Sequence, residues 1–519
     1  MRLGIDFGTT RIVVSAADRG NYPVLSFEAS DNEIRDWFPP LVAVRGAARC
    51  FGWTAYQKQS EAGWTLLRSL KRELEGAGAE STIAVDGHEY SILGLITGLA
   101  QELRSAILQH SSLALKGEEV LEVMLGVPAN ANSNQRYLTA EAFRAAGFVV
   151  LGMLNEPSAA SIEFSHRHKA DRKLGAAERV LVYDLGGGTF DASLVETLDD
   201  ANTVLATSGL ARFGGDDFDE ILAGLALPKE RRDWLMMGER FRLLEECRER
   251  KEAVKPTTRR IVLDLDQVSL GLGSVTVAVA DFEAACRPLI QESIEVVNRL
   301  VKGVSRPFDA LYVTGGGSEL PLVSRMLREA FGKWVRRSAY TRAATAIGLA
   351  IHADAASGYT LRERFGRNFG VWREADHGRR AWFDVIFEKG TMLPLPGAPP
   401  MVRERRYYPV HNIGHFRYLE AAEVTSESQP SGAMQYWDEI LFPFDPALAS
   451  GDDLTAVAVE HSGQAQGQQI QERFVCDVNG VVRVELINLT AGYARTYELA
   501  RWSRKAEPAA KKKRKVAKT

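Results

Sequence analysis

The sequence predicts an α/β region of two similar lobes, followed by an all-β region. An apolar strand that ends in an aspartate and a glycine turn occurs twice, at residues 1–10 (MRLGIDFGTT) and 180–191 (VLVYDLGGGTFD). Strand-like and helix-like segments alternate up to about residue 355, which is typical of α/β architecture. After about residue 368 the pattern changes to period-two alternation with prolines and glycine turns, which favours strands.

Hydrophobic periodicity gives the elements of the first region in order. We expect strands within residues 3–16, 41–44, 120–128, 149–154, 180–184 and 311–314. We expect helices over residues 92–109, 134–146, 221–234, 240–255 and 281–301, the last with Asp281 as its N-cap. Residues 65–72 carry apolar side chains at near-helical spacing. Residues 260–266 and 274–279 alternate as antiparallel strands.

Length and composition exclude several classes of protein. A chain of 519 residues should hold two or more domains, and its 45% hydrophobic and 25% charged residues are ordinary for a soluble globular protein. The net charge of −3 gives no overall electrostatic case for nucleic acid. No run approaches the ~18 apolar residues of a membrane span, so a cytoplasmic protein is the default expectation. The cysteines are far apart and suggest neither a disulfide framework nor a zinc site: Cys50, Cys247, Cys286 and Cys476.

The repeated turn has the chemistry of a phosphate and metal site. Glycines without Cβ let backbone N–H groups approach an anion closely. Asp184 at its strand end would repel phosphate, so it more plausibly faces a metal ion or its waters, while Thr189 and Asp191 can orient a water or a second cation. A third glycine turn follows a strand at residues 311–318 (LYVTGGGS). The alternative is a set of glycine-rich hairpins with their acids in solvent.

Two further polar residues are candidates, each with a plain structural alternative. Glu156 lies just beyond a strand and before a helix, which suits a ligand but also suits a first-turn acid. Lys71 ends an amphipathic segment, where most lysines are solvated. Two other nucleotide-binding motifs are absent from the sequence. There is no G-x-x-x-x-G-K-S/T loop, and the glycines at 271 and 273 lack the third glycine of a dinucleotide fingerprint.

Five motifs in order resemble the ATPase domain of the DnaK-type heat-shock chaperone family. They are IDFGTT (5–10), VPA (127–129), NEPSAA (155–160), DLGGGTFD (184–191) and FGGDDFD (213–219). The resemblance covers roughly residues 1–355. It implies an actin-like ATPase domain of two duplicated ribonuclease-H-like lobes that closes on ATP or ADP with Mg²⁺, and with K⁺ as a candidate second cation.

The resemblance also implies roles for individual residues. Asp6 and Asp184 would hold the metal. The catalytic residues would be Lys71, Glu156, Asp191 and Thr189, with Glu156 and Asp191 positioning water and cations. The nucleotide would be lined by Gly8, Thr9, Thr10, Gly186, Gly187, Gly188, Thr189, Gly214, Gly215, Lys251, Gly315, Gly316 and Gly317.

The base pocket departs from the family pattern. Glu252 and Glu319 stand where relatives carry arginines, and Arg342 stands where the family usually has an acid. An arginine plane stacks on a base with ~0.5–2 kcal/mol of cation–π energy, and a carboxylate offers none. The sequence therefore predicts intact phosphate chemistry with weaker or rearranged contacts to the base.

The remainder of the chain is expected to form a linker (356–368), a β-sandwich (369–503) and a disordered basic tail (504–519). Residues 359–366 read YTLRERFG, whereas the family has a short leucine-rich acidic linker that docks on the ATPase domain when ATP binds. Docking of that kind therefore does not follow from the resemblance. Residues 383–394, and the hairpin at 474–486 with a primed turn at Asn479 and Gly480, resemble the family's peptide-binding domain. We expect no helical lid. The tail would contact nucleic acid or acidic surfaces, or act only as a solubilising terminus.

Three functions remain open from the sequence. The first is a chaperone-like ATPase whose nucleotide state changes the grip of the β-domain on unfolded or extended polypeptide, with co-chaperones as further partners. The second is a nucleotide-gated scaffold for one dedicated protein partner, with slow or no turnover. The third is a metabolite kinase of the same superfamily, which the β-sandwich argues against because such kinases usually place their substrate between the lobes.

Overall fold

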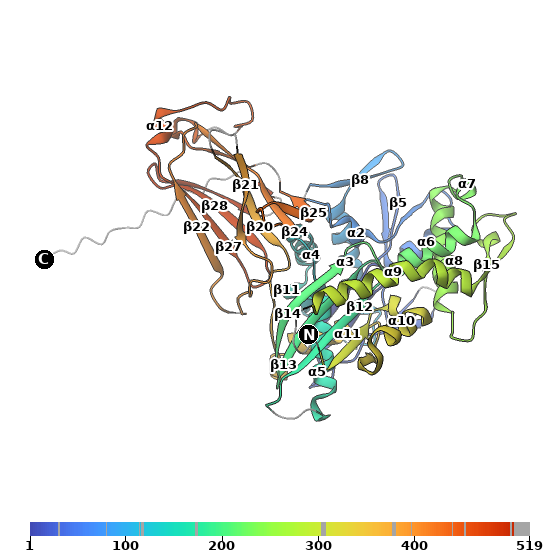
Figure 1. Cartoon of the computed structure of the whole chain (residues 1–519). Helices are drawn as coiled ribbons and strands as arrows, with labels where there is room; N and C mark the ends of the chain where they lie inside the picture. The colour runs from blue at the N-terminus through green and yellow to red at the C-terminus, as the bar shows by residue number, and fades with distance from the viewer. Residues whose placement is uncertain are drawn as a thin grey trace. The chain divides into compact units, whose positions relative to one another are not determined.

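The computed structural model describes residues 1–29, 32–78, 80–113, 115, 119–171, 175–302, 308–375, 380–395, 397–437, 440–450, 453–498 and 501–502. Residue contacts within the chain divide the protein into two compact units. Unit 1 comprises Met1–Ala131 and Gln135–Gly366, and unit 2 comprises Asn132–Asn134 and Arg367–Thr519. The basic tail predicted at residues 504–519 lies outside the described residues. Figure 1 shows unit 1 coloured blue to yellow and unit 2 coloured orange to red.

The first sheet of unit 1 carries the N-terminal turn. Its strand order is β11-β10-β1-β2, with β1 (Arg2–Phe7), β2 (Ile12–Ala16), β10 (Glu122–Val127) and β11 (Val149–Asn155). β1 pairs antiparallel with β2 across the glycine turn and parallel with β10. Nearly every residue of these strands except those of β11's first half is buried, as their apolar sequences require. We call this part lobe 1.

The second sheet repeats this plan. Its order is β18-β17-β12-β13-β14-β19, with β12 (Glu178–Leu185), β13 (Phe190–Leu198), β14 (Ala201–Leu210), β17 (Ala310–Thr314), β18 (Val335–Arg337) and β19 (Thr360–Arg362). β12 pairs antiparallel with β13 across the GGG turn and parallel with β17, just as β1 pairs with β2 and β10. We call this part lobe 2. The duplication predicted from the two acid-tipped turns is therefore present in the sheet topology.

Two helices lie between the sheets. α5 (Glu156–Arg167) packs on α11 (Ala344–Ala353), α11 contacts β1, β2 and β10, and α5 contacts β12 and β13. The approach is close: a Cβ on Gly348 would lie 1.8 Å from the carbonyl oxygen of Ala159, and one on Gly4 would lie 2.3 Å from that of Ala346. Glycine at these two positions is what lets the helices and the first sheet meet.

Smaller elements complete each lobe. Lobe 1 adds β3 (Phe27–Glu28), β4 (Ile34–Arg35), β5 (Val42–Arg45), β6 (Ala48–Phe51), α1 (Gly52–Gln57), β7 (Thr65–Leu67), α2 (Leu70–Glu73), β8 (Thr82–Val85), β9 (His88–Ser91) and α3 (Ile92–Gln109). Lobe 2 adds α6 (Gly215–Ala226), α7 (Lys229–Arg232), α8 (Met237–Glu252), β15 (Arg260–Asp264), β16 (Ser274–Ala278), α9 (Val279–Leu300) and α10 (Pro321–Phe331). α4 spans Ser133–Ala145.

Two local expectations were wrong. Residues 65–67 form strand β7, paired with β5, and only the four residues of α2 that follow are helical. All three residues of β7 are buried and paired with β5, and this pairing overrides the helix-like spacing of the segment. The N-cap of α9 is Ala278, and Asp281 lies in the first turn. An acid there still interacts favourably with the N-terminal N–H groups of the helix.

The segment expected to be a linker (356–368) contains a strand that belongs to lobe 2. Residues 360–362 form β19, which pairs in parallel with the start of β14, with Leu361 opposite Asn202. Leu361 is buried in the same cluster as Val195, Val204 and Tyr359. Pairing with β14 and the burial of Leu361 and Tyr359 hold this segment on the sheet, although it lacks a leucine-rich sequence.

Unit 2 is built from strands. One sheet has the order β21-β20-β24-β25, another β22-β27-β28-β29-β30, and β23 pairs with β26. The strands are β20 (Asn368–Ala375), β21 (Arg380–Phe387), β22 (Met401–Tyr407), β23 (Ile413–Phe416), β24 (Tyr418–Val424), β25 (Pro430–Tyr436), β26 (Ile440–Pro443), β27 (Ile470–Cys476), β28 (Val482–Asn488), β29 (Tyr493–Glu498) and β30 (Arg501–Trp502), with one short helix α12 (Gly463–Gln466).

The two larger sheets of unit 2 pack face to face. Phe369 on β20 contacts Phe474 on β27 with ring centroids 6.1 Å apart, and it stacks on Tyr418 at 5.9 Å. Arg373 on β20 also reaches across, donating a 2.6 Å hydrogen bond to the buried Glu472 on β27. Inner faces that meet through aromatic side chains are typical of a β-sandwich.

The hairpin between β27 and β28 is present, but its turn differs from the one expected. Gly480 has a φ of 72°, whereas Asn479 is not among the positive-φ residues, so the type I′ turn is absent. The Asp477 side chain accepts hydrogen bonds from the backbone N–H groups of Asn479 and Val481, both at 2.9 Å. The aspartate therefore holds a longer loop in which only the glycine needs positive φ.

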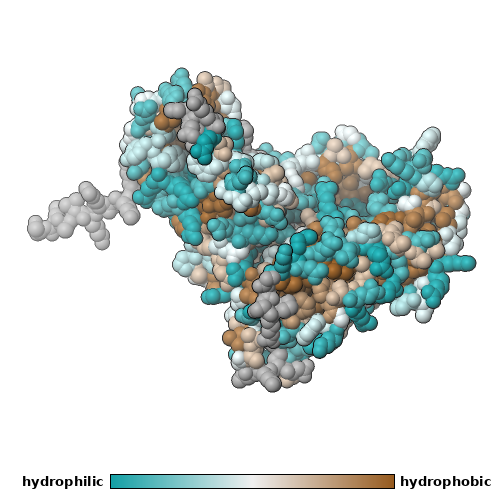
Figure 2. Space-filling model, viewed as in Figure 1, coloured by the Kyte–Doolittle hydropathy of each residue, from teal (hydrophilic) through white to brown (hydrophobic). Residues whose placement is uncertain are grey.

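The surface in Figure 2 is mainly hydrophilic, with smaller apolar areas between the polar ones. Within the described ranges, no helix combines the length and the hydropathy that crossing a bilayer would require.

Candidate functional site

A cleft lies between the two lobes of unit 1. Its empty volume is ≈ 1010 Å³, including space open to solvent. Most of the residues predicted for the site line it: Asp6, Gly8, Thr9, Thr10, Lys71, Glu156, Asp184, Gly186, Gly187, Thr189, Gly215, Lys251, Gly315, Gly316 and Gly317. These residues come from all three glycine turns, so the fold brings together segments that are far apart in the sequence.

The two acid-tipped turns face each other directly. A Cβ on Gly187 would lie 2.6 Å from Oγ1 of Thr10, and one on Gly188 would lie 2.4 Å from Oγ1 of Thr9. The third turn closes over Asp184: Gly315 has a φ of 83°, and a Cβ there would lie 2.4 Å from Oδ1 of Asp184. Glycine is needed at these positions because the turns approach each other more closely than side chains would permit.

Three predicted residues do not line the cleft. Gly188 accepts a 2.8 Å hydrogen bond from Arg72 through its carbonyl oxygen, and the N–H of Gly214 donates a 2.7 Å hydrogen bond to Asp217. Asp191 accepts a 3.0 Å hydrogen bond from the backbone N–H of Ala129. These three are absent from the cleft lining, and they support the turns that do form it.

Four carboxylates surround one lysine at the centre of the site. Nζ of Lys71 lies 2.5 Å from Oε1 of Glu156, and both side chains are buried. Burial, then the charge of Glu156, raises the pKa of Asp6 to about 7 and that of Asp191 to about 7, while Lys71 partly opposes the shift. Burial and the three other carboxylates raise the pKa of Asp184 well above its ordinary value. One ammonium group does not neutralise this cluster, which therefore attracts a cation.

The acid set fits Mg²⁺ bound together with phosphate. Within the described ranges, no group of three or more His, Cys, Asp or Glu side chains could hold a metal ion by itself. Mg²⁺ is usually bound by one or two carboxylates, with waters and substrate phosphates completing its shell. Asp6 and Asp184 on the facing turns can supply those carboxylates, and the glycine N–H groups around them can receive the phosphates.

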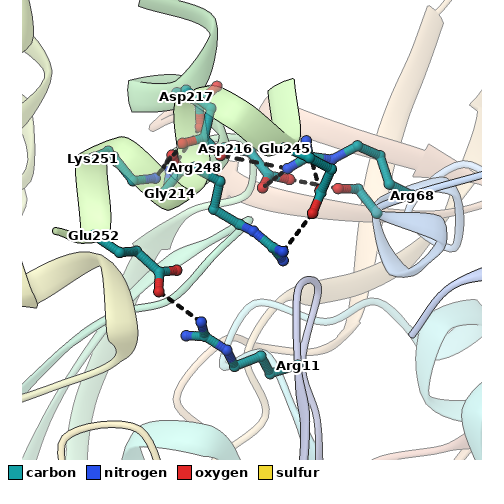
Figure 3. Close-up of polar contacts among 12 residues, drawn as sticks. Arg11, Arg68, Gly214, Asp216, Asp217, Glu245, Arg248, Lys251 and Glu252 are labelled. Carbon is teal, nitrogen blue, oxygen red and sulfur yellow. Dashed lines mark hydrogen bonds and ion pairs between the residues drawn. The ribbon is translucent and has the colours of Figure 1, made fainter. Parts of the chain in front are cut away.

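The residues around Lys71 tie its segment to lobe 2. Arg68 lies 2.9 Å from Asp216, 3.4 Å from Asp219 and 3.4 Å from Glu245. Ser69 donates a 2.5 Å hydrogen bond to Asp216, and Arg72 donates a 2.8 Å hydrogen bond to Asp217. We call Asp216, Asp217, Asp219 and Glu245 the acidic cluster. Figure 3 shows Asp216, Asp217 and Glu245, with Arg68 approaching them. The contacts of Ser69 and Arg72 therefore fix the chain on both sides of Lys71.

A wall of alternating charges lines another part of the cleft. Glu252, at the end of α8, lies 2.7 Å from Arg11 and 3.2 Å from Arg342, and Arg342 lies 2.6 Å from Glu319. We call these four residues the charged wall. Burial would raise the pKa of Glu252, but Arg11 and Arg342 outweigh it and lower the pKa to about 2. Glu252, Glu319 and Arg342, which depart from the family pattern, therefore form ion pairs with one another and with Arg11.

Lys251, next to Glu252, is also held by protein groups. It donates a 2.6 Å hydrogen bond to the carbonyl oxygen of Gly215 and pairs with Asp219 at 2.5 Å. Its ammonium group stays in the cleft lining, so it links α8 to the start of α6 at the edge of the site.

A buried carboxylate connects β19 to the site. Glu363, just after β19, accepts hydrogen bonds from the backbone N–H of Asn155 at 2.9 Å and from its side-chain amide at 2.8 Å. Burial raises the pKa of Glu363, although the Asn155 N–H and the charge of Arg136 oppose the shift. Asn155 directly precedes Glu156, so the segment after β19 contacts the residue that positions a candidate catalytic acid.

Sequence reasoning missed Arg11, Arg68, Arg72 and Glu363. Their partners lie far along the chain, and no short motif contains both members of any pair. The only available signal for Arg11 was its place directly after the Gly-Thr-Thr turn.

One comparison with known proteins bears on the cleft. The family model described as Hsp70 protein matches residues 2–364, which include both lobes, all three glycine turns and β19.

Proposed function

Because this chain belongs to the Hsp70 protein family, whose members are generally chaperones that bind ATP or ADP with Mg²⁺, we propose that it is a chaperone-like ATPase. Its nucleotide state would change the grip of unit 2 on unfolded or extended polypeptide. The observation that carries this proposal is the pair of facing acid-tipped turns, with Lys71 and Glu156 between them in a cleft lined by glycines.

The arrangement supports phosphoryl transfer from ATP to water. Such chemistry needs mainly positioning and charge neutralisation, which backbone N–H groups and one lysine can supply. Asp6 and Asp184 would hold Mg²⁺. When bound, Mg²⁺ would neutralise part of the negative charge of the phosphates. Lys71 would donate to the phosphate oxygens that gain charge. Glu156, Asp191 and Thr189 would orient the attacking water.

The contacts of β19 support coupling between the cleft and the segment that leads to unit 2. Any movement of β19 away from β14 would also withdraw Glu363 from Asn155, and so disturb the residue before Glu156. Nucleotide state and the position of this segment would then affect each other, because linked equilibria are reciprocal.

ATP turnover with and without an unfolded peptide library tests the proposal. Hydrolysis that rises several-fold with peptide, and falls on Lys71→Ala, is the expected result. Nucleotide binding with no peptide response, together with one tightly bound protein partner, would favour the dedicated scaffold instead. Phosphate transfer to a small metabolite would favour the kinase. Absence of nucleotide binding would overturn all three.

A further inference from the structure

We propose that Arg11 is a positioning residue that joins the two lobes through Glu252 and thereby slows nucleotide release. The inference rests on the proposed function and goes beyond it by naming the residue pair that controls how long the nucleotide stays. The sequence reasoning assigned no role to Arg11.

The Arg11–Glu252 pair connects one lobe to the other. Arg11 lies in the turn between β1 and β2 of lobe 1, and Glu252 is the last residue of α8 in lobe 2. Their charged groups are 2.7 Å apart, and their side chains are only 15% and 29% exposed. Figure 3 shows the two side chains pointing toward each other from separate elements. A pair with this little exposure is less screened by water and salt than an ordinary surface pair.

Both members of the pair are held by other groups. The guanidinium of Arg11 lies 5.1 Å from the ring centroid of Trp37, within the range of a cation–π contact. Glu252 is also contacted by Arg342, which Glu319 holds in turn. An ion pair between long side chains usually costs side-chain conformational entropy. Because other groups already hold Arg11 and Glu252, forming this pair costs little further entropy.

The pair also belongs to the wall of the nucleotide cleft. Arg11, Glu252, Glu319 and Arg342 all line it, together with Gly315, Gly316 and Gly317. Nε of Arg11 is buried and has no hydrogen-bond partner among the described residues, so one donor of this group is left for a ligand. A bound nucleotide that accepts this hydrogen bond would hold Arg11 more firmly against Glu252.

Release of a nucleotide from between the lobes requires them to separate, and separation breaks this pair. Removing one member of a mostly buried charge pair acts mainly on dissociation rates. We therefore expect Arg11→Ala and Glu252→Ala each to speed release by about 10- to 100-fold. Because the two act as one pair, the double variant should release no faster than the quicker single variant.

Stopped-flow fluorescence tests the inference on the full chain. Each protein is loaded with ADP carrying a methylanthraniloyl group on its ribose, and release is followed after adding excess unlabelled ADP. Arg325→Ala is the matched control, because Arg325 and Glu283 form a 2.6 Å ion pair within lobe 2, away from the residues of the cleft. Arg11→Lys keeps the charge and should restore part of the slow release.

The outcomes separate this inference from the proposed function. Wild-type protein that shows no saturable binding of the labelled ADP would overturn both. Normal wild-type binding with release from Arg11→Ala and Glu252→Ala within about 2-fold of wild type would overturn this inference alone. Additive acceleration in the double variant would also overturn it, because the residues would then act separately. Circular dichroism spectra show which variants are folded, and Glu252→Ala removes the same ion pair if Arg11→Ala does not fold.

Discussion

Lys71 is the residue on which the chemistry of the cleft depends. Its ammonium group faces Asp6, Glu156, Asp184 and Asp191, and its Nζ lies 2.5 Å from Oε1 of Glu156. Burial would lower the pKa of Lys71, but Glu156 and Asp6 outweigh it and raise the pKa, so the ammonium form is retained. A protonated lysine beside a metal-binding acid set is well suited to receive a phosphate group.

Replacing Lys71 with alanine should slow ATP hydrolysis by about 10²–10⁴-fold, because one donor to the reacting phosphate is lost. Nucleotide binding should be largely kept, since the glycine turns and both metal acids remain. Single-turnover hydrolysis and equilibrium binding measured on the same preparation check the two parts. Hydrolysis within about 3-fold of wild type would remove Lys71 from the mechanism.

Glu252 gives a prediction for pH. It faces Arg11, Arg342 and Arg248, which outweigh its burial and lower its pKa to about 2. An acid with a lowered pKa contributes stability above its ordinary pKa of 4.5, and that contribution is lost as the pH falls toward 2. The melting temperature of wild type should exceed that of Glu252→Gln by a constant amount above about pH 5, and the difference should shrink at about pH 3. A difference that stays constant to pH 3 would contradict the assignment.

At the residue level, the sequence located the acids and glycines because they belong to short motifs. It located Lys71 only through the resemblance to a family. It could not pair Arg11 with Glu252 or Glu363 with Asn155, since each pair joins distant segments. It found Glu252, Glu319 and Arg342 by their departure from a family pattern, but it could not tell that they contact one another. A residue that departs from a family pattern marks a position of interest, but the sequence does not show which residue it contacts.

At the level of elements, the segment from β7 to α2 is held by charge more than by apolar packing. Arg68 is largely buried and contacts three acids that come from α6 and α8. These contacts cross between the lobes, and they explain why so short a helix as α2 keeps a fixed position.

Arg68→Ala should destabilise unit 1 by about 3–5 kcal/mol, because Asp216, Asp219 and Glu245 would keep their burial and lose a partner. Chemical denaturation followed by tryptophan fluorescence measures the change. Arg325→Ala, which breaks a more exposed pair, should cost no more than about 1 kcal/mol. Equal effects of the two substitutions would show that the acidic cluster does not depend on Arg68.

The position of β19 can be tested by hydrogen exchange. Its pairing with β14 and the two hydrogen bonds to Glu363 should protect the backbone of residues 360–363. Glu363→Ala should raise exchange there by about 10-fold or more, with little change in β12 or β17. Fast exchange of this segment in the wild-type protein would contradict the docked position.

Periodicity located most of the elements that it predicted to within a few residues, including α3, for which the expected and observed bounds coincide. It failed at β7 and β19, which are three residues long and owe their conformation to pairing with distant strands. It also failed at the β27–β28 turn, where Asp477 determines the loop. Elements this short carry too few residues for a period to be visible.

On the scale of the whole molecule, the two acid-tipped turns explain most of unit 1. Each begins a sheet with the same pairing pattern, and each supplies one carboxylate to the cleft. The sequence revealed this duplication because both turns keep their acid, glycine and threonine. It revealed the all-β character of unit 2 by alternation, although the order of its strands depends on contacts that alternation does not encode.

The central claim is that the facing turns hold a magnesium triphosphate, and calorimetric titration with ATP tests it most directly. Wild-type protein should bind one ATP, with affinity at least about 10-fold weaker when Mg²⁺ is removed by a chelator. The double variant Asp6→Asn with Asp184→Asn should bind weakly whether or not Mg²⁺ is present. Wild-type affinity that does not respond to Mg²⁺, or full affinity in the double variant, would contradict the account.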